Sequence, residues 1–232
     1  MTLDTTQMGG VTPWPLRVAN VGPATSKPLT PRPAITGIYR QTITAPAAGS
    51  TTAFMSTGVA GPNATTATYS AGGANFDGTL GATGIIPVAR NVVVTVTHVS
   101  SVVACSGTIT GEDQYGRTIT EDWSVTATGT SKTFTGAKAF KKVTSITITA
   151  AGDSSANTVR FGTGNVFGLA FPTACASLLK EYEDITLRTN GTLVAASSSA
   201  SADRRGTYAP NTTPNGTINW NIWYLVEDFT AI

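Results

Sequence analysis

The sequence has little charge. Only 12% of its 232 residues are charged, and 15 Lys and Arg stand against 13 Asp and Glu, which leaves a formal net charge of +2. Such a small excess produces no strong positive field of the kind that nucleic-acid binding requires. We therefore expect neither DNA nor RNA as a partner.

Long apolar runs are also missing. No stretch approaches the roughly 20 consecutive apolar residues that a bilayer-spanning helix needs. The first residues, "MTLDTTQMGG", lack the basic start and the apolar stretch of a signal peptide. We expect no membrane partner, and a protein that stays in the compartment where it is made.

Reactive side chains are few. His98 is the single histidine, and its place at the end of a valine-rich segment favours a hydrogen-bonded rim position. Cys105 and Cys175 have no CxxC spacing for zinc and are too few for a disulfide framework. We interpret both thiols as reduced packing residues, in preference to a single bridge. The sequence predicts no enzyme, no cofactor and no metal.

Strand-forming residues dominate what is present. Thr, Ala, Gly and Ser are abundant and the usual helix formers are scarce, which is typical of an all-β protein. Apolar residues alternate in "RNVVVTVTHV", "TSITITA" and "TINWNIWYLVED". Gly-rich turns separate these segments, and we predict a β-sandwich of jelly-roll type with roughly eight to ten strands. Only "CASLLKEYED", residues 175–184, favours a short helix.

The chain begins with a proline-rich segment that shows no sustained period. Because proline removes backbone donors and fixes φ, we predict an extended arm over residues 1–36 and a sandwich domain over residues 37–232. A flexible tail is the alternative for the arm, and residues 173–232 could form a C-terminal hairpin extension. The arm holds half of the 12 prolines, namely Pro13, Pro15, Pro23, Pro28, Pro31 and Pro33.

The segment "DQYGRTITEDWSV", residues 113–125, is the most charged part of the chain. Two alternating runs flank Gln114-Tyr115-Gly116, and a three-residue loop with Gly116 in the left-handed region sets Thr110 opposite Thr120. In this register Asp113 lies opposite Arg117, and we predict a β-hairpin.

One residue conflicts with this hairpin. Ile109, Ile119, Trp123 and Val125 share an apolar face in the predicted register, but Glu121 shares that face too. A rim or intersubunit position for Glu121 would remove the conflict, and so would a different register.

The acidic residues of the hairpin are the only candidates for catalysis by paired carboxylates. Neighbouring residues on a strand point to opposite faces, so neither Glu112 and Asp113 nor Glu121 and Asp122 converge. We interpret them as surface charges that keep an exposed sheet edge soluble.

Two other motifs have weak signals. "GTGNVFG", residues 162–168, resembles a dinucleotide-binding loop, but Phe167 replaces the third glycine and no βαβ unit follows, so we interpret it as a turn. "DRRG", residues 203–206, suits either an acidic partner surface or a solvated loop with a local Asp-Arg pair, and the second reading is favoured.

Several phrases in order are similar to virion structural proteins of tailed bacteriophages, of the capsid cement or head decoration type. The similarity runs from about Thr36 to the C-terminus. It implies a jelly-roll-like β-sandwich that sits as homotrimers on the capsid exterior, is assembled in the host cytoplasm and has no catalytic residues. The phrases are "NFDGTLGATGIIPVARNVVVTVTH", "GTITGEDQYGRTITEDWSV", "GAKAFKKVTSITITA", "FGTGNVFGLAF" and "RRGTYAPNTTPNGTINWNIWYLV".

The resemblance predicts a cement protein that binds the major capsid protein and stabilises contacts between its subunits. The candidate partner-contact residues are Trp14, Arg17 and Arg32 in the arm, with Trp220 and Trp223 near the C-terminus. Core packing is the favoured alternative for the two C-terminal tryptophans. The rival functions are a tail- or fibre-associated module that binds host-surface carbohydrate, and a virion glycosidase, which the lone histidine disfavours.

Overall fold

The computed structural model describes residues 35–60, 66–97, 102–128, 131–149, 158–173 and 178–227. These residues form thirteen strands and no helix, and every strand pair is antiparallel. The all-β prediction is confirmed. Most of the proline-rich arm lies outside the described residues, including Trp14, Arg17 and Arg32, and so do His98 and Cys175. The jelly-roll strand order stays a prediction.

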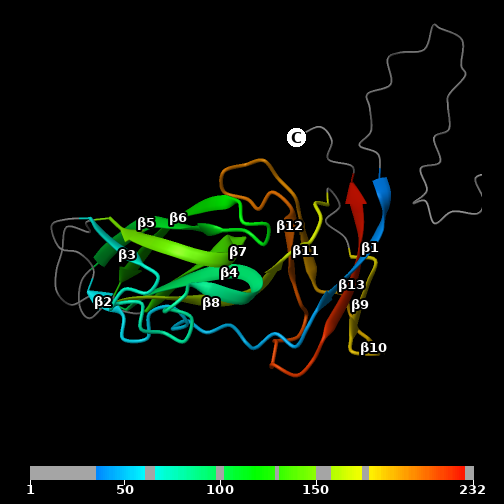
Figure 1. Ribbon diagram of the computed structural model, residues 1–232, viewed down its shortest axis with the longest axis horizontal. Coiled ribbons are helices and arrows are strands. Elements are labelled where there is room, and N and C mark those ends of the chain that lie inside the picture. Colours follow the sequence, from blue (N-terminus) through cyan, green and yellow to red (C-terminus); the bar gives the residue numbers. More distant parts are fainter. Residues whose placement is uncertain are drawn as a thin grey trace, which may run out of the picture.

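The larger sheet contains the long strands (Figure 1). Its main path has the order β11-β12-β8-β4-β7-β5-β6, while β2 pairs with β8 and β3 pairs with β7. The bounds are β2 Val59–Ala60, β3 Ala67–Ser70, β4 Ile85–Thr97, β5 Val102–Glu112, β6 Thr118–Thr128, β7 Lys132–Ile148, β8 Thr158–Gly168, β11 Thr192–Ala195 and β12 Gly206–Ala209.

The smaller sheet lies at the other end of the molecule and joins the two ends of the described chain (Figure 1). Its order is β1-β13-β9-β10. The bounds are β1 Ile35–Ile43, β9 Lys180–Glu183, β10 Thr186–Leu187 and β13 Trp220–Glu227. The helix predicted over residues 175–184 is therefore wrong where it is described. Glu181 and Glu183 alternate with more exposed neighbours, as strand residues do.

Two apolar clusters form the core. The first lies among the long strands, where Val92, Val94 and Val96 are all fully buried, as their alternation predicts. The second lies between the inner face of the smaller sheet and the strands β11, β12 and the end of β8. Its largest buried members are Trp220, Tyr208, Tyr224 and Phe167.

Gly84 lies directly before β4 and is hydrogen-bonded to the backbone of Val143 in β7. Its φ is +68°, and its carbonyl accepts a hydrogen bond of 2.9 Å from the Val143 backbone. A Cβ at this position would overlap the Val143 carbonyl oxygen. Gly37 is the contrasting case, because a Cβ there would meet no atom within 4 Å.

Gly84→Ala is expected to destabilise the protein by about 2 kcal/mol or more, because it adds both a steric overlap and an unfavourable φ. Gly37→Ala is the matched control and should change the free energy of unfolding by less than about 1 kcal/mol. Urea unfolding of both variants measures the difference. Equal losses in the two variants would contradict this account of Gly84.

Candidate functional site

The charged hairpin forms as predicted. Thr110 pairs with Thr120, the Asp113 backbone N–H donates to the Arg117 carbonyl at 2.9 Å, and Gly116 has a φ of +76°. Ile109 and Trp123 face the first cluster and are buried. Local alternation and one turn glycine were sufficient to predict this register.

The tip of the hairpin is attached to the rest of the chain. Asp113 and Arg205 form an ion pair whose side chains are only 12% and 13% exposed. The Arg205 guanidinium also lies 4.0 Å from the centre of the Tyr115 ring. Gln114 Nε2 donates to the Leu169 carbonyl at 2.9 Å, and Tyr115 Oη donates to the Ala170 carbonyl. We call Asp113, Gln114, Tyr115 and Arg205 the hairpin latch.

The hairpin latch decides between the readings given above for the charged hairpin and for the loop at residues 203–206. The charged tip is an internal joint between the hairpin and the loop before β12. In the loop at residues 203–206, the Arg205 side chain pairs with a carboxylate 92 positions away in the sequence. Only the backbone N–H of Arg205 makes the local contact, with Asp203 Oδ1 at 2.8 Å. Arg204 is exposed.

The other three hairpin carboxylates have separate partners. Glu112 lies 3.5 Å from the Lys142 amine, and Asp122 accepts a 2.7 Å hydrogen bond from Thr108 Oγ1. Glu121 points inward and is 5% exposed. The geometry agrees with the prediction that these carboxylates do not converge on one point.

Glu121 is not at a rim and the hairpin has the predicted register, so these two explanations for its position are wrong. The long strand β7 contains a bulge, because Asn91 pairs with Ala139 whereas Val93 pairs with Thr135. Glu121 Oε1 accepts the backbone N–H groups of Ala137 at 2.6 Å and of Lys138 at 3.2 Å within this bulge. The buried acid therefore satisfies donors that the sheet ladder leaves unpaired.

Burial raises the pKa of this acid and of a second one. Desolvation raises the pKa of Glu121, although the two backbone hydrogen bonds oppose the change. Glu121 Oε2 is buried without a hydrogen-bond partner, and this lack of solvation adds to the cost of the charged form. Desolvation also raises the pKa of Asp203, whose Oδ2 accepts the Ala139 backbone N–H at 2.9 Å.

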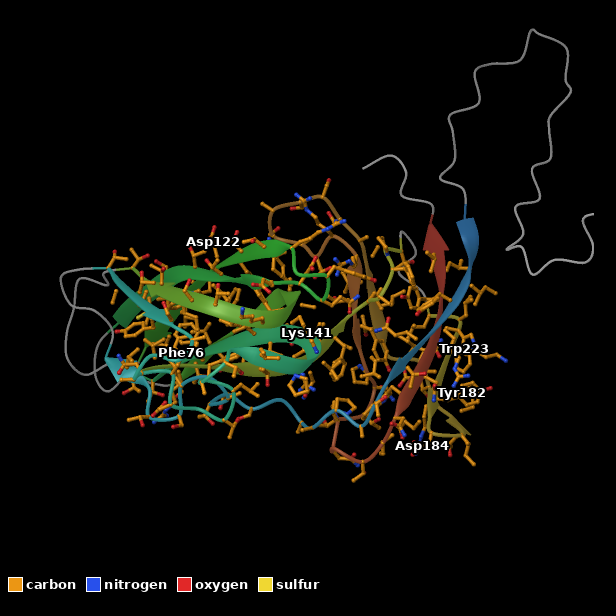
Figure 2. The ribbon with its side chains drawn as sticks, viewed as in Figure 1. Phe76, Asp122, Lys141, Tyr182, Asp184 and Trp223 are labelled. Carbon is orange, nitrogen blue, oxygen red and sulfur yellow. The ribbon has the colours of Figure 1, made fainter. Side chains whose placement is uncertain are left out.

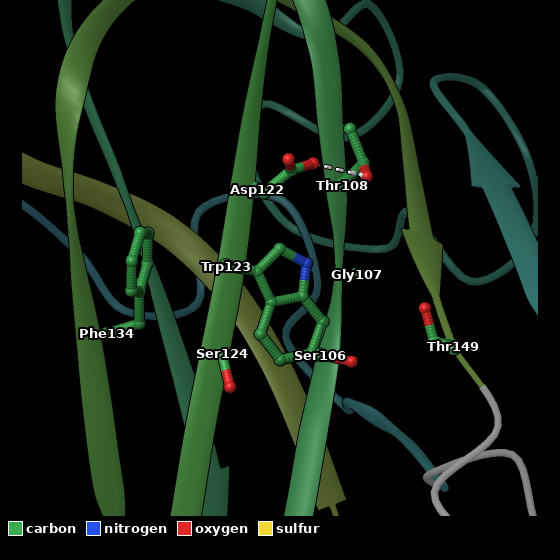
Figure 3. A pocket seen from close by; sticks show the side chains of 8 residues that line it. All are labelled: Ser106, Gly107, Thr108, Asp122, Trp123, Ser124, Phe134 and Thr149. Atoms are coloured by element: carbon green, nitrogen blue, oxygen red, sulfur yellow. Dashed lines mark hydrogen bonds between the residues drawn. The ribbon is translucent and has the colours of Figure 1, made fainter. Parts of the chain in front are cut away.

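A pocket of about 540 Å³ opens beside this hairpin (Figure 3). Its lining combines hydroxyl groups with Asp122, and Trp123 packs beside Gly107 with its indole Nε1 lacking a hydrogen-bond partner. The lining side chains supply one carboxylate and no imidazole, amine or thiol, so they hold no acid-base pair. They are Ser106, Thr108, Asp122, Trp123, Ser124, Phe134 and Thr149, with Gly107.

The described ranges contain neither a cluster of metal ligands nor a membrane-spanning helix. There, no group of three or more His, Cys, Asp or Glu side chains is placed to hold a metal ion. No helix among those residues is long and apolar enough to span a bilayer. Cys105, the thiol that the structure describes, is free and buried, and desolvation raises its pKa.

The candidate binding site is the surface of the smaller sheet that points away from the second cluster, which we call the outer face. Trp223 lies on it between Arg40 and Lys180, and the next row contains Asn221 beside Tyr182. Figure 2 shows Trp223, Tyr182 and Asp184 together at this end of the molecule. The outer-face residues are Ile38, Arg40, Thr42, Lys180, Tyr182, Leu187, Asn221, Trp223 and Leu225.

Aromatic and apolar groups are exposed on the outer face. The Tyr182 and Trp223 rings make an edge contact with centroids 5.1 Å apart. They border a pocket of about 550 Å³ together with Ile38, Leu179 and Lys180. Ile38 is 65% exposed, which is unusual for an isoleucine in the middle of a strand.

The structure separates the two C-terminal tryptophans predicted as contact residues. Trp220 is fully buried in the second cluster, so core packing is its role. Trp223, three positions later, has the opposite orientation and is half-buried on the outer face. Sequence reasoning missed Tyr182 and Lys180 because their segment was assigned to a helix, and it missed Arg40 because β1 and β13 are far apart in the chain.

Comparisons with family models, with curated proteins and with solved structures find no match to this chain.

Breaking the hairpin latch should destabilise the protein. Arg205→Met is expected to lower the free energy of unfolding by about 2 kcal/mol, because Asp113 then has a poorly solvated carboxylate without its cation. The exposed neighbour gives a matched control, and Arg204→Met should stay within about 0.5 kcal/mol of the wild type. Combining Arg205→Met with Asp113→Asn should recover part of the loss in chemical denaturation. Equal effects of the two arginine substitutions would reject the latch.

Glu121→Gln should alter how stability depends on pH. Because the folded-state pKa is raised, the stability contribution of Glu121 is complete below its ordinary value of 4.5 and is lost as pH rises through the folded pKa. Gln cannot ionise, so the variant should gain stability relative to the wild type between pH 4.5 and pH 8. Glu112→Gln, at a half-exposed position, is the control. A difference between Glu121→Gln and wild type that is the same at both pH values would refute this interpretation.

Proposed function

We propose that this chain is a cement protein of a tailed-phage head, which binds the outer capsid surface and stabilises contacts between major capsid protein subunits. The observation that supports this most is the exposed outer face of the smaller sheet. Ile38 and Leu187 are 65% and 58% exposed there, beside the half-buried Trp223. Exposed apolar groups that share one face of a sheet mark surfaces that bind other proteins.

The ordered phrases from residue 75 to residue 226 support the same function through their similarity to virion structural proteins. The finer parts of this proposal are a jelly-roll-like sandwich, a homotrimer and an N-terminal arm that reaches neighbouring subunits. In the arm, Trp14, Arg17 and Arg32 are the proposed contact residues. Trp223 is the contact residue near the C-terminus.

A cement function depends on contact area. Each square ångström of apolar surface removed from water contributes about 25 cal/mol, and specific interfaces bury about 800 Å² on each partner. Much of this gain is offset by the entropy of association, so a single contact is modest. Repetition over many copies of a shell makes the total large.

The acidic side chains of the hairpin fit a structural function better than a catalytic one. Asp113 belongs to the hairpin latch, and Glu121 accepts hydrogen bonds from backbone N–H groups in the bulge of β7. Glu112 and Asp122 have different surface partners, Lys142 and Thr108, and do not contact each other. A glycosidase would need two carboxyl groups facing one bond.

A second candidate function is carbohydrate binding by a tail- or fibre-associated module. One observation favours it, namely the half-buried ring pair of Tyr182 and Trp223 beside the polar Asn221. Sugar rings stack on aromatic side chains of this kind. Binding of the isolated protein on a glycan array would support this candidate over the cement protein.

Electron microscopy and heating of phage particles test the main proposal. Immunogold labelling with an antibody against this chain should mark the head, and particles without the chain should release DNA at a lower temperature than complete particles. Labelling confined to the tail would favour the second candidate. An unchanged release temperature would reject the stabilising function.

A further inference from the structure

Three outer-face side chains form a row across the smaller sheet. Arg40 on β1 is paired with Trp223 on β13, and Trp223 is paired with Lys180 on β9. The guanidinium of Arg40 lies 5.4 Å from the centre of the Trp223 ring. Since adjacent strands are ~4.8 Å apart, the backbones that carry the two cations are separated by about 10 Å. The row therefore has a positive group on each side of an indole.

The two positive charges are not neutralised within the described part of the chain. Arg40 donates to Asn221 Oδ1 at 2.9 Å and 3.3 Å, and this amide oxygen is neutral. The ion pairs among the described residues involve Lys142, Arg188 and Arg205. None of the nine outer-face side chains named above is acidic, and the exposed Asp184 at the same end of the molecule has its Oδ1 engaged by the backbone N–H and the side-chain amide of Asn219. The row of Arg40, Trp223 and Lys180 is therefore complementary to negative charge.

The pocket beside the row indicates the class of partner. Ile38 and Leu179 line it with Trp223, and they are 65% and 41% exposed. Exposed aliphatic side chains gain most by contact with apolar protein groups, whereas a sugar would leave their surfaces poorly matched. The pocket therefore fits an apolar side chain of a protein.

A symmetrical contact between two copies of the outer face is unfavourable. A two-fold axis through this face would bring Arg40 and Lys180 close to the same cations of the second copy. Like charges facing each other across an interface oppose binding. The partner surface must therefore differ from this one and carry the opposite charge.

We propose that the outer face binds an acidic segment of another virion protein. In this arrangement an apolar side chain enters the pocket beside Trp223, and carboxylates lie against Arg40 and Lys180. The inference rests on the proposed cement function, because it specifies the chemistry of the partner on the capsid. It adds that the contact is partly electrostatic and weakens with salt.

Peptide binding to the full chain tests this proposal. The probe is a short synthetic peptide that alternates glutamate and leucine, and its counterpart has glutamine in place of glutamate. Fluorescence anisotropy should show that the glutamate peptide binds more tightly and that its affinity falls as NaCl is raised. Lys180→Glu should weaken binding by about fivefold, and Trp223→Ala by about tenfold or more.

Lys132→Glu is the matched control, because Lys132 is an exposed lysine at the start of β7 in the larger sheet. It should bind the peptide as the wild type does, and near-UV circular dichroism should show that each variant is folded. Equal affinity for the two peptides, or an equal loss in Lys132→Glu, would overturn the proposal. Self-association that Trp223→Ala abolishes would also overturn it, and so would binding of neutral oligosaccharides in place of the peptide.

Incorporation into particles distinguishes this inference from the cement function. If the wild type is absent from heads but still prefers the glutamate peptide, the cement function fails and the acidic preference of the surface stands. If Lys180→Glu and Trp223→Ala are incorporated as well as the wild type, the cement function stands and this docking surface is wrong.

Discussion

The pairing of β1 with β13 is the constraint on which the smaller sheet depends. It brings together residues such as Arg40 and Asn221, which are 181 positions apart in the sequence. The entropy lost in closing so long a loop must be offset by contacts that form at the same time. The second apolar cluster supplies them, because Ile43, Trp220 and Tyr224 all become buried on the inner side of this pair.

The sequence predicts those parts of the structure in which the interacting residues are close together along the chain. The hairpin around Gly116 was predicted down to its register, because alternation and turn chemistry act between neighbours. The orientation of Trp220 and Trp223 on opposite faces also follows from alternation. The arrangement of Arg40, Trp223 and Lys180 does not, since no local pattern tells which distant strands become neighbours.

Several predictions from the sequence are wrong because pairing between distant strands is invisible to local patterns. The turn predicted over residues 162–168 is part of β8, which pairs with β4 and β12. Residues 180–183 have good helix formers, but strand pairing with β13 overrides this weak local preference. Glu121 looked misplaced because a buried acid is costly unless it is hydrogen-bonded. Its partners are backbone groups of a bulge in β7, and a bulge leaves no sequence signal as clear as a turn glycine.

The alternation of β13 separates stability from binding. Trp220, Ile222 and Tyr224 are fully buried, whereas Trp223 and Leu225 are not and point to the other side. Evolution can therefore change the outer face to suit a partner while the inner side keeps the sheet packed. Side chains on the outer face do not pack in the core, so their size and shape are not constrained by close packing. The indole of Trp223 and the cations beside it therefore remain accessible on the outer side without disturbing the buried side chains of the same strand.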